Sequence, residues 1–498
     1  MNKHTSHRQI SDLPVEGTGR SRAGIILKNS GALGASTILG KFFYFLLFIL
    51  IGRHLGPGDL GKFTFALSFV AMFGVINDLG LNLLAVRDVA KEKQLAEKYL
   101  GNLITLKLML GVLAFAFTML LINLMGYPRD NVKLILLIAS AALFNTLSGG
   151  MRWVFHAFQK FEYESMIGIV QNLLCFALGF SAVFLGLGIY GVGYSQILVG
   201  VLIVFLSWFV IKKRFMLVSA RIDWSFWKEI LKQSVPFALM LVFTGLYVNV
   251  DTVLLSKIKG DQAVGIYGAA NRLVQAGKMV PSVIVPALFP MMAGISKAGR
   301  LEFNRFLEKS AVLMFGLALP FSVGTTILAG PIIGLFYGAE FAASIPCLQI
   351  LIWGMFFMYI SIVLGYGLIS KGKQKANTLI TGLGLGLSLI LNFLLIPRWG
   401  NLGSSVAVLS TEFFVMSAGM FFVRRLMGFD FKGFLVPALK VAVATLVMAL
   451  VLYLSRSLSL YFCVVAGVAT YFGSIFALGG LYDYNLYKVR DLILTRTA

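Results

Sequence analysis

The chain has 498 residues, of which 58% are hydrophobic, and its formal net charge is +22. This apolarity, with a mean hydropathy of +0.86, excludes an ordinary soluble domain and indicates a polytopic membrane protein. The basic residues are spread over many short loops and do not gather in one patch, so no nucleic-acid partner is expected.

The length of the apolar stretches predicts the number of membrane crossings. A helix needs about 20 apolar residues to cross the hydrocarbon core, and this length predicts an all-α protein with about fourteen transmembrane helices. A disordered cytoplasmic tail over residues 1–24 is expected before them. The predicted spans are 29–51, 62–86, 99–125, 133–157, 164–187, 190–211, 233–256, 263–293, 307–328, 344–370, 376–396, 402–423, 434–454 and 459–482.

The loops between these spans predict the orientation of the protein. One side carries 30 Lys and Arg residues, the other carries 8, and 5 lie at membrane depth. The positive-inside rule makes the first side cytoplasmic. Because the number of spans is even, both termini are expected in the cytoplasm, and the chain is expected in the cytoplasmic (inner) membrane.

An internal repeat is suggested by matches 204 residues apart. Leu27-Lys28-Asn29-Ser30 matches Leu231-Lys232-Gln233-Ser234, and the segment 61–66 matches 265–270. The alternative explanation is a shared loop composition. Two repeats of six spans enter the membrane in the same orientation and are related by an axis along the membrane normal. The predicted units are an N-terminal six-helix bundle (25–211), a cytoplasmic amphipathic linker (212–232), a C-terminal six-helix bundle (233–425), and two extra helices with a cytoplasmic tail (426–498).

Five basic residues fall inside predicted spans: Lys41, Lys107, Arg152, Arg272 and Lys278. A charge at this depth costs roughly 2.5–3.5 kcal/mol on insertion scales, so such residues usually face a cavity or a partner. Lys107 is close enough to the end of its span to snorkel, and for Arg152 snorkelling, phospholipid contact and a cavity role all stay open. Because few carboxylates accompany these cations, we expect a cavity that receives an anionic group.

Three carboxylates also lie at depth: Asp78, Asp251 and Glu412. Asp251 is expected to pair with Arg272, and Asp78 either acts as a cap or pairs with Arg87. Glu412 is a candidate partner for a buried lysine or a proton or cation site. All three are therefore candidates for ion coupling. The histidines and cysteines show no metal-ligand spacing, so no metal site is predicted.

Several segments resemble polysaccharide-export flippases. They are Asn77-Asp78-Leu79-Gly80-Leu81, Asp251-Thr252-Val253-Leu254-Leu255, the run 264–273, and Ile396-Pro397-Arg398-Trp399-Gly400. The resemblance covers most of residues 25–480. It implies the O-antigen flippase type within the multidrug/oligosaccharidyl-lipid/polysaccharide exporter superfamily, which has a MATE-like fold of two six-helix bundles around an alternately opening cavity.

The same resemblance bears on two cavity residues. Arg272 matches a cavity arginine of the related lipid II flippases. The first span departs from the pattern of those proteins, because it carries the single Lys41 where they have several arginines. Lipid II itself is therefore not the expected substrate.

These observations predict a flippase for a polyprenyl-diphosphate-linked oligosaccharide, such as the repeat unit of an O-antigen or another surface polysaccharide. The expected diphosphate ligands are Lys41, Arg152, Arg272 and Lys278. Expected contacts to the sugars come from Asn145, Asn249 and Gln275. The expected partners are the lipid-linked substrate, membrane lipids, and the polysaccharide polymerase and chain-length machinery.

Two other functions stay open at this stage. One is a multidrug or cation antiporter of the same fold, which the excess of cations at depth disfavours. The other is a membrane enzyme of polysaccharide assembly, a polymerase or ligase, which would need a large outer catalytic loop that the sequence lacks. No nucleotide-binding motif is present, and we expect neither an enzymatic activity nor a cofactor.

Overall fold

The computed structural model describes residues 19–216, 219–296, 299–429 and 432–479, and these residues form helices and no strands. Thirteen of the described helical segments are long and apolar enough to cross a membrane. The first of them, Ile38–Lys91, is bent and covers most of the first two predicted spans, so the prediction of about fourteen transmembrane helices is confirmed. Residues 1–18 of the predicted tail lie outside the described residues.

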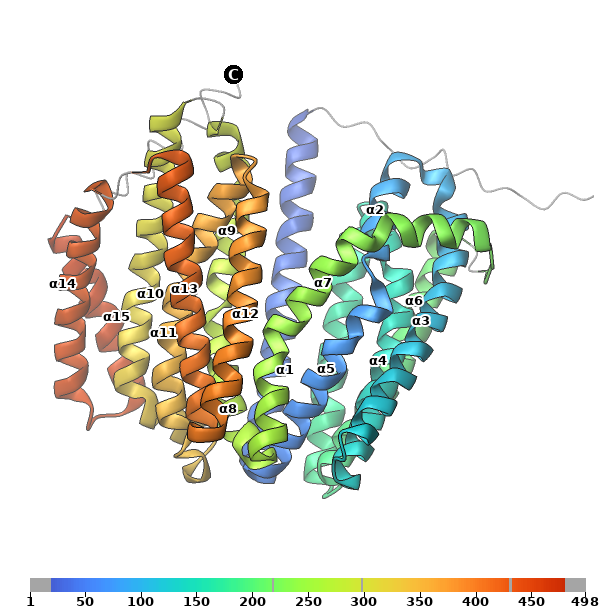
Figure 1. The fold of residues 1–498 in the computed structure, drawn as a ribbon, viewed down its shortest axis with the longest axis horizontal. Helices are drawn as coiled ribbons and strands as arrows, with labels where there is room; N and C mark the ends of the chain where they lie inside the picture. The colour runs from blue at the N-terminus through green and yellow to red at the C-terminus, as the bar shows by residue number, and fades with distance from the viewer. Residues whose placement is uncertain (1–18, 217–218, 297–298, 430–431, 480–498) are drawn as a thin grey trace, which may run out of the picture.

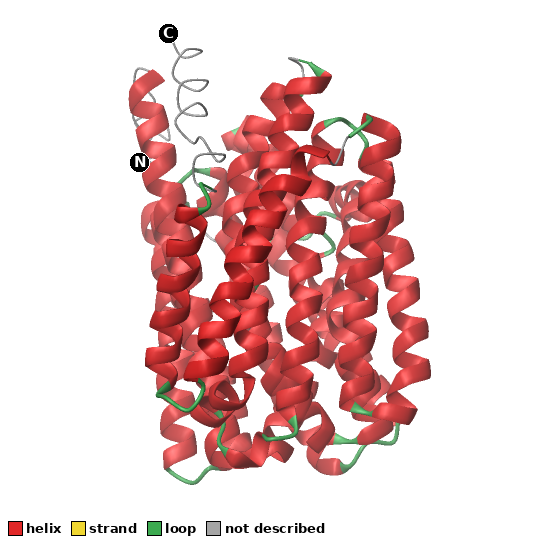
Figure 2. Cartoon of the chain, turned by 90° about the vertical axis from the view of Figure 1, so that its left-hand side faces the viewer, coloured by secondary structure: helices red, strands yellow, loops and turns green. Residues whose placement is uncertain are grey.

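The helices run side by side along one direction and form two groups (Figures 1 and 2). The first group contains α1 (Gly19–Asp78), α2 (Leu81–Lys91), η2 (Lys93–Leu95), α3 (Ala96–Leu124), α4 (Arg129–Ala157), α5 (Phe161–Phe184) and α6 (Gly188–Arg214). The second contains α7 (Trp224–Lys259), α8 (Asp261–Gly277), α9 (Met279–Ile295), α10 (Arg300–Phe336), η3 (Ala339–Phe341), α11 (Ser344–Ser370), α12 (Gln374–Trp399) and α13 (Asn401–Met427). Two further helices, α14 (Lys432–Ser455) and α15 (Leu460–Ala477), pack against α10.

Two glycines at equivalent repeat positions break the helical path in the same way. Gly56 bends α1 with φ 78° and ψ 178°, and Gly260 separates α7 from α8 with φ 80° and ψ −177°. Both conformations lie in a region of positive φ that side chains disfavour. The equality of the two breaks, 204 residues apart, supports the repeat that the sequence suggests.

The two repeats also touch each other at equivalent residues. A Cβ atom on Gly61 would overlap the carbonyl oxygen of Asp261, and a Cβ atom on Gly265 would overlap that of Pro57. The contact of Gly61 with Asp261 is thus equivalent to the contact of Gly265 with Pro57, as in a contact across a two-fold axis. The prediction of parallel repeats is confirmed, and the axis passes between α1 and α8 at what we call the closed end.

Residues 224–232 of the predicted linker form the start of α7, which is attached to the N-terminal bundle. Asp223 caps α7 by accepting a 3.1 Å hydrogen bond from the N–H of Phe226. Hydrogen bonds from the Ser225 hydroxyl and from that N–H lower the pKa of Asp223 below its ordinary value. The indole of Trp227 donates to Asn102 of α3 at 3.0 Å. The part of the predicted linker from Trp224 onward is therefore helical and continuous with the seventh span.

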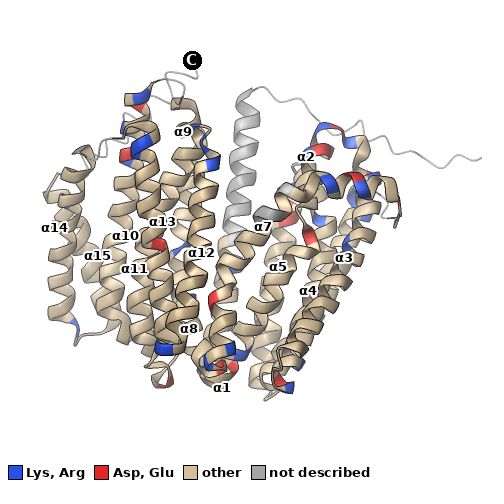
Figure 3. Ribbon diagram, in the orientation of Figure 1, with Lys and Arg blue, Asp and Glu red and all other residues tan. Residues whose placement is uncertain are grey.

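The outer surface of the helices is apolar. Large side chains of α14 and α15 are widely exposed, including Leu446 at 69% and Val465 at 69%. Figure 3 shows that Lys and Arg gather mainly at the two ends of the helices, whereas the middle is almost uncharged. Such a band of exposed apolar side chains between charged ends is the expected surface of a membrane-spanning protein.

Candidate substrate cavity

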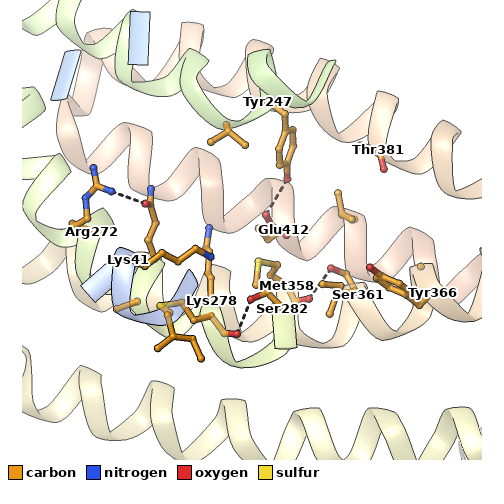
Figure 4. Close-up of a pocket in the computed structure, with 18 of the residues that line it drawn as sticks. Lys41, Tyr247, Arg272, Lys278, Ser282, Met358, Ser361, Tyr366, Thr381 and Glu412 are labelled. Carbon is orange, nitrogen blue, oxygen red and sulfur yellow. Dashed lines mark hydrogen bonds between the residues drawn. The ribbon is translucent and has the colours of Figure 1, made fainter. Parts of the chain in front are cut away.

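A cavity of about 860 Å³ lies between α1 and the C-terminal bundle. Its walls come from α1, α7, α8, α9, α11, α12 and α13. Figure 4 shows its charged and polar side chains. Across the view, Arg272 and Lys41 come first, Lys278 and Glu412 follow, and Ser361, Tyr366 and Thr381 come last. The last three lie toward the turn between α11 and α12.

The break between α8 and α9 places Lys278 in this cavity. Pro281 has no N–H to donate to the carbonyl of Gly277 four residues earlier, so one helical hydrogen bond is missing at this point. The hydroxyl of Tyr359 on α11 donates to that carbonyl at 2.7 Å instead. Lys278 itself closes α8 with φ −62° and ψ −11°. The predicted span 263–293 is thus two helices with a cation at their junction.

Arg272 is held by aromatic rings and one amide. Its guanidinium carbon lies 3.5 Å from the ring centroid of Phe48 and 5.3 Å from that of Tyr44. One guanidinium nitrogen donates to the side-chain oxygen of Gln275 at 3.2 Å. A guanidinium has five N–H donors, and within the described residues only one hydrogen bond of Arg272 is formed, so further donors can serve a ligand. The aromatic faces stabilise the cation without neutralising it.

Lys41 and Lys278 also line the cavity without a direct ion pair in the described part of the chain. Lys41 is exposed to the cavity. Lys278 interacts electrostatically with Glu412 and Asp251. Three cations therefore face one carboxylate in this space, and the cavity has a net positive charge.

Two of the predicted ligands lie elsewhere, in the N-terminal bundle. Arg152 forms a bidentate ion pair with Glu164 of α5 and donates to Gln171 at 3.1 Å. Asn145 accepts a hydrogen bond from the same Gln171 at 2.9 Å. The structure does not bring these residues together with Lys41, Arg272 and Lys278, because local partners on α5 satisfy them.

Asp78 and Asp251, two of the candidates for ion coupling, lie outside the cavity. Asp78 pairs with Lys107, which is 1% exposed, so the expectation that Lys107 snorkels is wrong, as is the expected pairing of Asp78 with Arg87. Asp251 accepts hydrogen bonds from Tyr267 and from the N–H of Thr252. The expected Asp251–Arg272 pair is therefore also wrong, since the tyrosine takes the carboxylate.

Of the remaining predicted residues, two line the cavity and one does not. Gln275 lines the cavity, whereas the amide of Asn249 donates to the carbonyl of Gly245 on its own helix at 2.9 Å and Asn249 is not among the cavity residues. Glu412, the third candidate for ion coupling, lines the cavity and accepts a 3.0 Å hydrogen bond from Tyr247.

Sequence reasoning missed the neutral polar residues of the cavity. They are Tyr247, Ser282, Ser361, Tyr366, Asn377 and Thr381. Single hydroxyls and amides in an apolar helix are cheap to bury against the backbone of the same helix, so they give little signal in the sequence. These residues are recognised as cavity residues only when the structure shows that they line the same cavity.

An apolar groove of about 660 Å³ adjoins the cavity. It is lined by side chains of α10, α14 and α15, and it shares Phe45 and Ala276 with the cavity. Phe45 follows Tyr44 on α1, and Ala276 follows Gln275 on α8, so the shared residues lie beside Arg272 and its partners. The groove therefore meets the cavity near its cationic side chains.

Fold and site together define a polytopic membrane transporter with two repeated bundles and a cationic cavity. A family model described as "Polysaccharide biosynthesis protein" matches residues 26–296, more than half of the chain. The chain therefore belongs to this family. A second model, MatE, matches residues 236–394.

The chain is also similar to individual proteins over most of its length. It is 21% identical to the capsular polysaccharide biosynthesis protein CapF of Staphylococcus aureus, covering 80% of this chain and 100% of that protein. It is 22% identical to a putative O-antigen transporter of Shigella flexneri, covering 72% of this chain and 88% of that protein. The structure of lipid II flippase MurJ in an inward closed conformation shares the fold, with a TM-score of 0.74 and 20% identity over 94% of this chain and 100% of MurJ.

Proposed function

We propose that this chain translocates a polyprenyl-diphosphate-linked oligosaccharide from the cytoplasmic to the outer leaflet by alternating access. The observation that carries the proposal is the order of environments along one path. An apolar groove leads to three cations, and these lead to neutral hydroxyls, amides and aromatic rings. A lipid tail, a diphosphate and a sugar follow one another in the same order in such a substrate.

The charge of the cavity suits this substrate. A diphosphate that links a lipid to a sugar has two negative charges, which need compensation away from water. Lys41, Arg272 and Lys278 supply three positive charges, and the carboxylate of Glu412 offsets one of these charges. An organic cation, the substrate of a multidrug antiporter, would meet a net repulsion in the same space.

The sidedness follows from the distribution of Lys and Arg. We assign the α11–α12 end and both termini to the cytoplasm of a cell with an inner membrane, because the basic loops lie there. A polymerase and chain-length machinery are the proposed partners, because two relatives are named as a putative O-antigen transporter and a capsular polysaccharide biosynthesis protein. Asp251, buried beside Tyr267, is the proposed site of ion coupling outside the cavity.

Flipping in liposomes tests the proposal. The full chain, reconstituted in liposomes, is expected to move a fluorescent polyprenyl-diphosphate N-acetylglucosamine between leaflets. Arg272→Gln and Lys278→Gln are each expected to slow this movement by about tenfold or more, because each removes a charge-assisted contact worth about 1.5–3 kcal/mol. Lys228→Gln, an exposed lysine near the start of α7, serves as the control. Absence of any movement by the folded wild-type chain would overturn the proposal.

A further inference from the structure

The two ends of the cavity differ in the kind of hydrogen bond that they offer. Lys41, Arg272 and Lys278 at one end have donors and no acceptors. The end toward the α11–α12 turn has none of these cations among its described lining residues, and its polar groups are hydroxyls, one amide and one carboxylate. The nature of the second end decides which sugar fits there.

Three of the hydroxyls that line the cavity already use their protons. Ser282 donates to the carbonyl of Met279 at 2.7 Å, Ser361 to that of Met358 at 3.1 Å, and Thr381 to that of Asn377 at 3.0 Å. A hydroxyl has one donor and two acceptor sites. Each of these side chains therefore presents acceptor oxygens to the cavity.

Glu412 adds the strongest acceptor. One of its carboxylate oxygens accepts from the hydroxyl of Tyr247 at 3.0 Å, and the other has no hydrogen-bond partner in the described part of the chain. Lys278 lines the same cavity and interacts electrostatically with this carboxylate. Figure 4 places Glu412 between Lys278 and the residues Ser361 and Thr381, at the border of the two ends.

Resting on the flippase function proposed above, we propose that the sugar next to the diphosphate is selected as an uncharged hydrogen-bond donor, and that Glu412 excludes acidic sugars from this position. A neutral or N-acetylated sugar offers O–H and N–H donors to the acceptor-rich end. The carboxylate of a uronic acid offers only acceptors and brings a negative charge toward Glu412, which repels it. The net charge of the cavity is already matched by the diphosphate alone.

Two glycolipid probes test this selection with the full chain in liposomes. The probes are fluorescent polyprenyl diphosphates that carry either N-acetylglucosamine or glucuronic acid, and the measured quantity is the ratio of their flipping rates. The wild-type chain is expected to move the neutral probe at least about tenfold faster, the size of one unfavourable charge contact. Glu412→Gln is expected to reduce this preference by about tenfold, because the amide no longer repels the uronate.

Two further variants make the result decisive. Thr381→Lys places a cation at the acceptor-rich end, and it is expected to raise the flipping of the acidic probe relative to the neutral one even if Glu412→Gln does not fold. Glu302→Gln removes an exposed carboxylate of α10 outside the cavity and is expected to keep the wild-type ratio.

The outcomes separate this inference from the function on which it rests. Equal flipping of both probes by the wild-type chain would overturn the selection and leave the flippase function standing. An equal slowing of both probes by Glu412→Gln would assign that carboxylate to folding or coupling and also overturn the selection. If neither probe moves, the flippase function itself fails.

Discussion

Lys107 and Lys278 carry the same side chain at membrane depth, yet their surroundings differ. Lys107 is 1% exposed, and its ammonium contacts the Asp78 carboxylate and the Asn82 side-chain oxygen, the latter at 2.8 Å. Lys278 lines a cavity and makes no direct ion pair in the described part of the chain. The first lysine is neutralised by the fold, whereas the second keeps a charge that a ligand can use.

The Lys107–Asp78 pair leads to a prediction about stability. Lys107→Met is expected to lower the free energy of unfolding by about 3 kcal/mol, because removing one partner of a buried pair leaves a charge uncompensated. This is the low end of the usual range, since the Asp78 side chain is 31% exposed. Thermal and denaturant unfolding in detergent measure the change.

Two controls accompany this prediction. The double variant Lys107→Met with Asp78→Leu is expected to recover most of the loss, since no unpaired charge remains. Lys98→Met breaks the exposed pair with Asp223 and is expected to cost less than about 1 kcal/mol. A loss in the double variant as large as in the single one would show that packing, and not charge, explains the effect.

At the scale of elements, the break between α8 and α9 connects local sequence to the cavity. Pro281 removes a helical N–H, and the Tyr359 hydroxyl satisfies the carbonyl of Gly277 that is left free. This hydrogen bond joins α11 to the end of α8 one residue before Lys278. The position of the lysine therefore depends on a contact between two helices.

Removal of this hydroxyl gives the second prediction. Tyr359→Phe is expected to destabilise the protein by about 1–3 kcal/mol, because a buried carbonyl loses its partner. It is also expected to weaken binding of the diphosphate glycolipid, since Lys278 is then less well positioned. Tyr453→Phe removes an exposed hydroxyl of α14 and is the matched control. Unchanged stability and binding in Tyr359→Phe would contradict this role of the hydroxyl.

At the scale of the whole molecule, the two repeats contact each other at the closed end. Gly61 and Gly265 let α1 and α8 meet backbone to backbone beside the two-fold axis. Asn131 of α4 also donates to the carboxylate of Asp261 at 2.9 Å and 3.0 Å. Alternating access requires the two bundles to separate here.

A substitution at this contact gives the third prediction. Gly265→Ala is expected to favour a conformation in which the two repeats separate at the closed end. Its methyl group overlaps the carbonyl of Pro57, and such overpacking costs about 1–3 kcal/mol. Labelling of Ser282→Cys by a membrane-impermeant maleimide from the outer side measures the opening. The native cysteines Cys175, Cys347 and Cys463 are buried and give a low background.

The matched control is Gly382→Ala on α12, where an added methyl group meets open space. It is expected to leave the labelling of Ser282→Cys unchanged. If Gly265→Ala also leaves the labelling unchanged, the glycine contact does not hold the two repeats together.

Much of the fold was predictable from the sequence because membrane helices obey local rules. Length and apolarity predict each span, and six spans per repeat predict two bundles of the same orientation. The break at Lys278 was missed, since apolar residues continue on both sides of Pro281. Three of the four predicted diphosphate ligands line one cavity, and the fourth, Arg152, does not.

By itself, the sequence determined the class of the protein, the number of its spans and the presence of cations that the membrane cannot easily hold. Only the tertiary structure decided which of these cations are neutralised and which face a ligand. Arg152 and Lys107 meet Glu164 and Asp78 on other helices, and no periodicity along one helix records such a meeting. The physical reason is that a Coulomb energy depends on the distance between charges in space, whereas the spacing of residues in a span reports only which face of one helix they share.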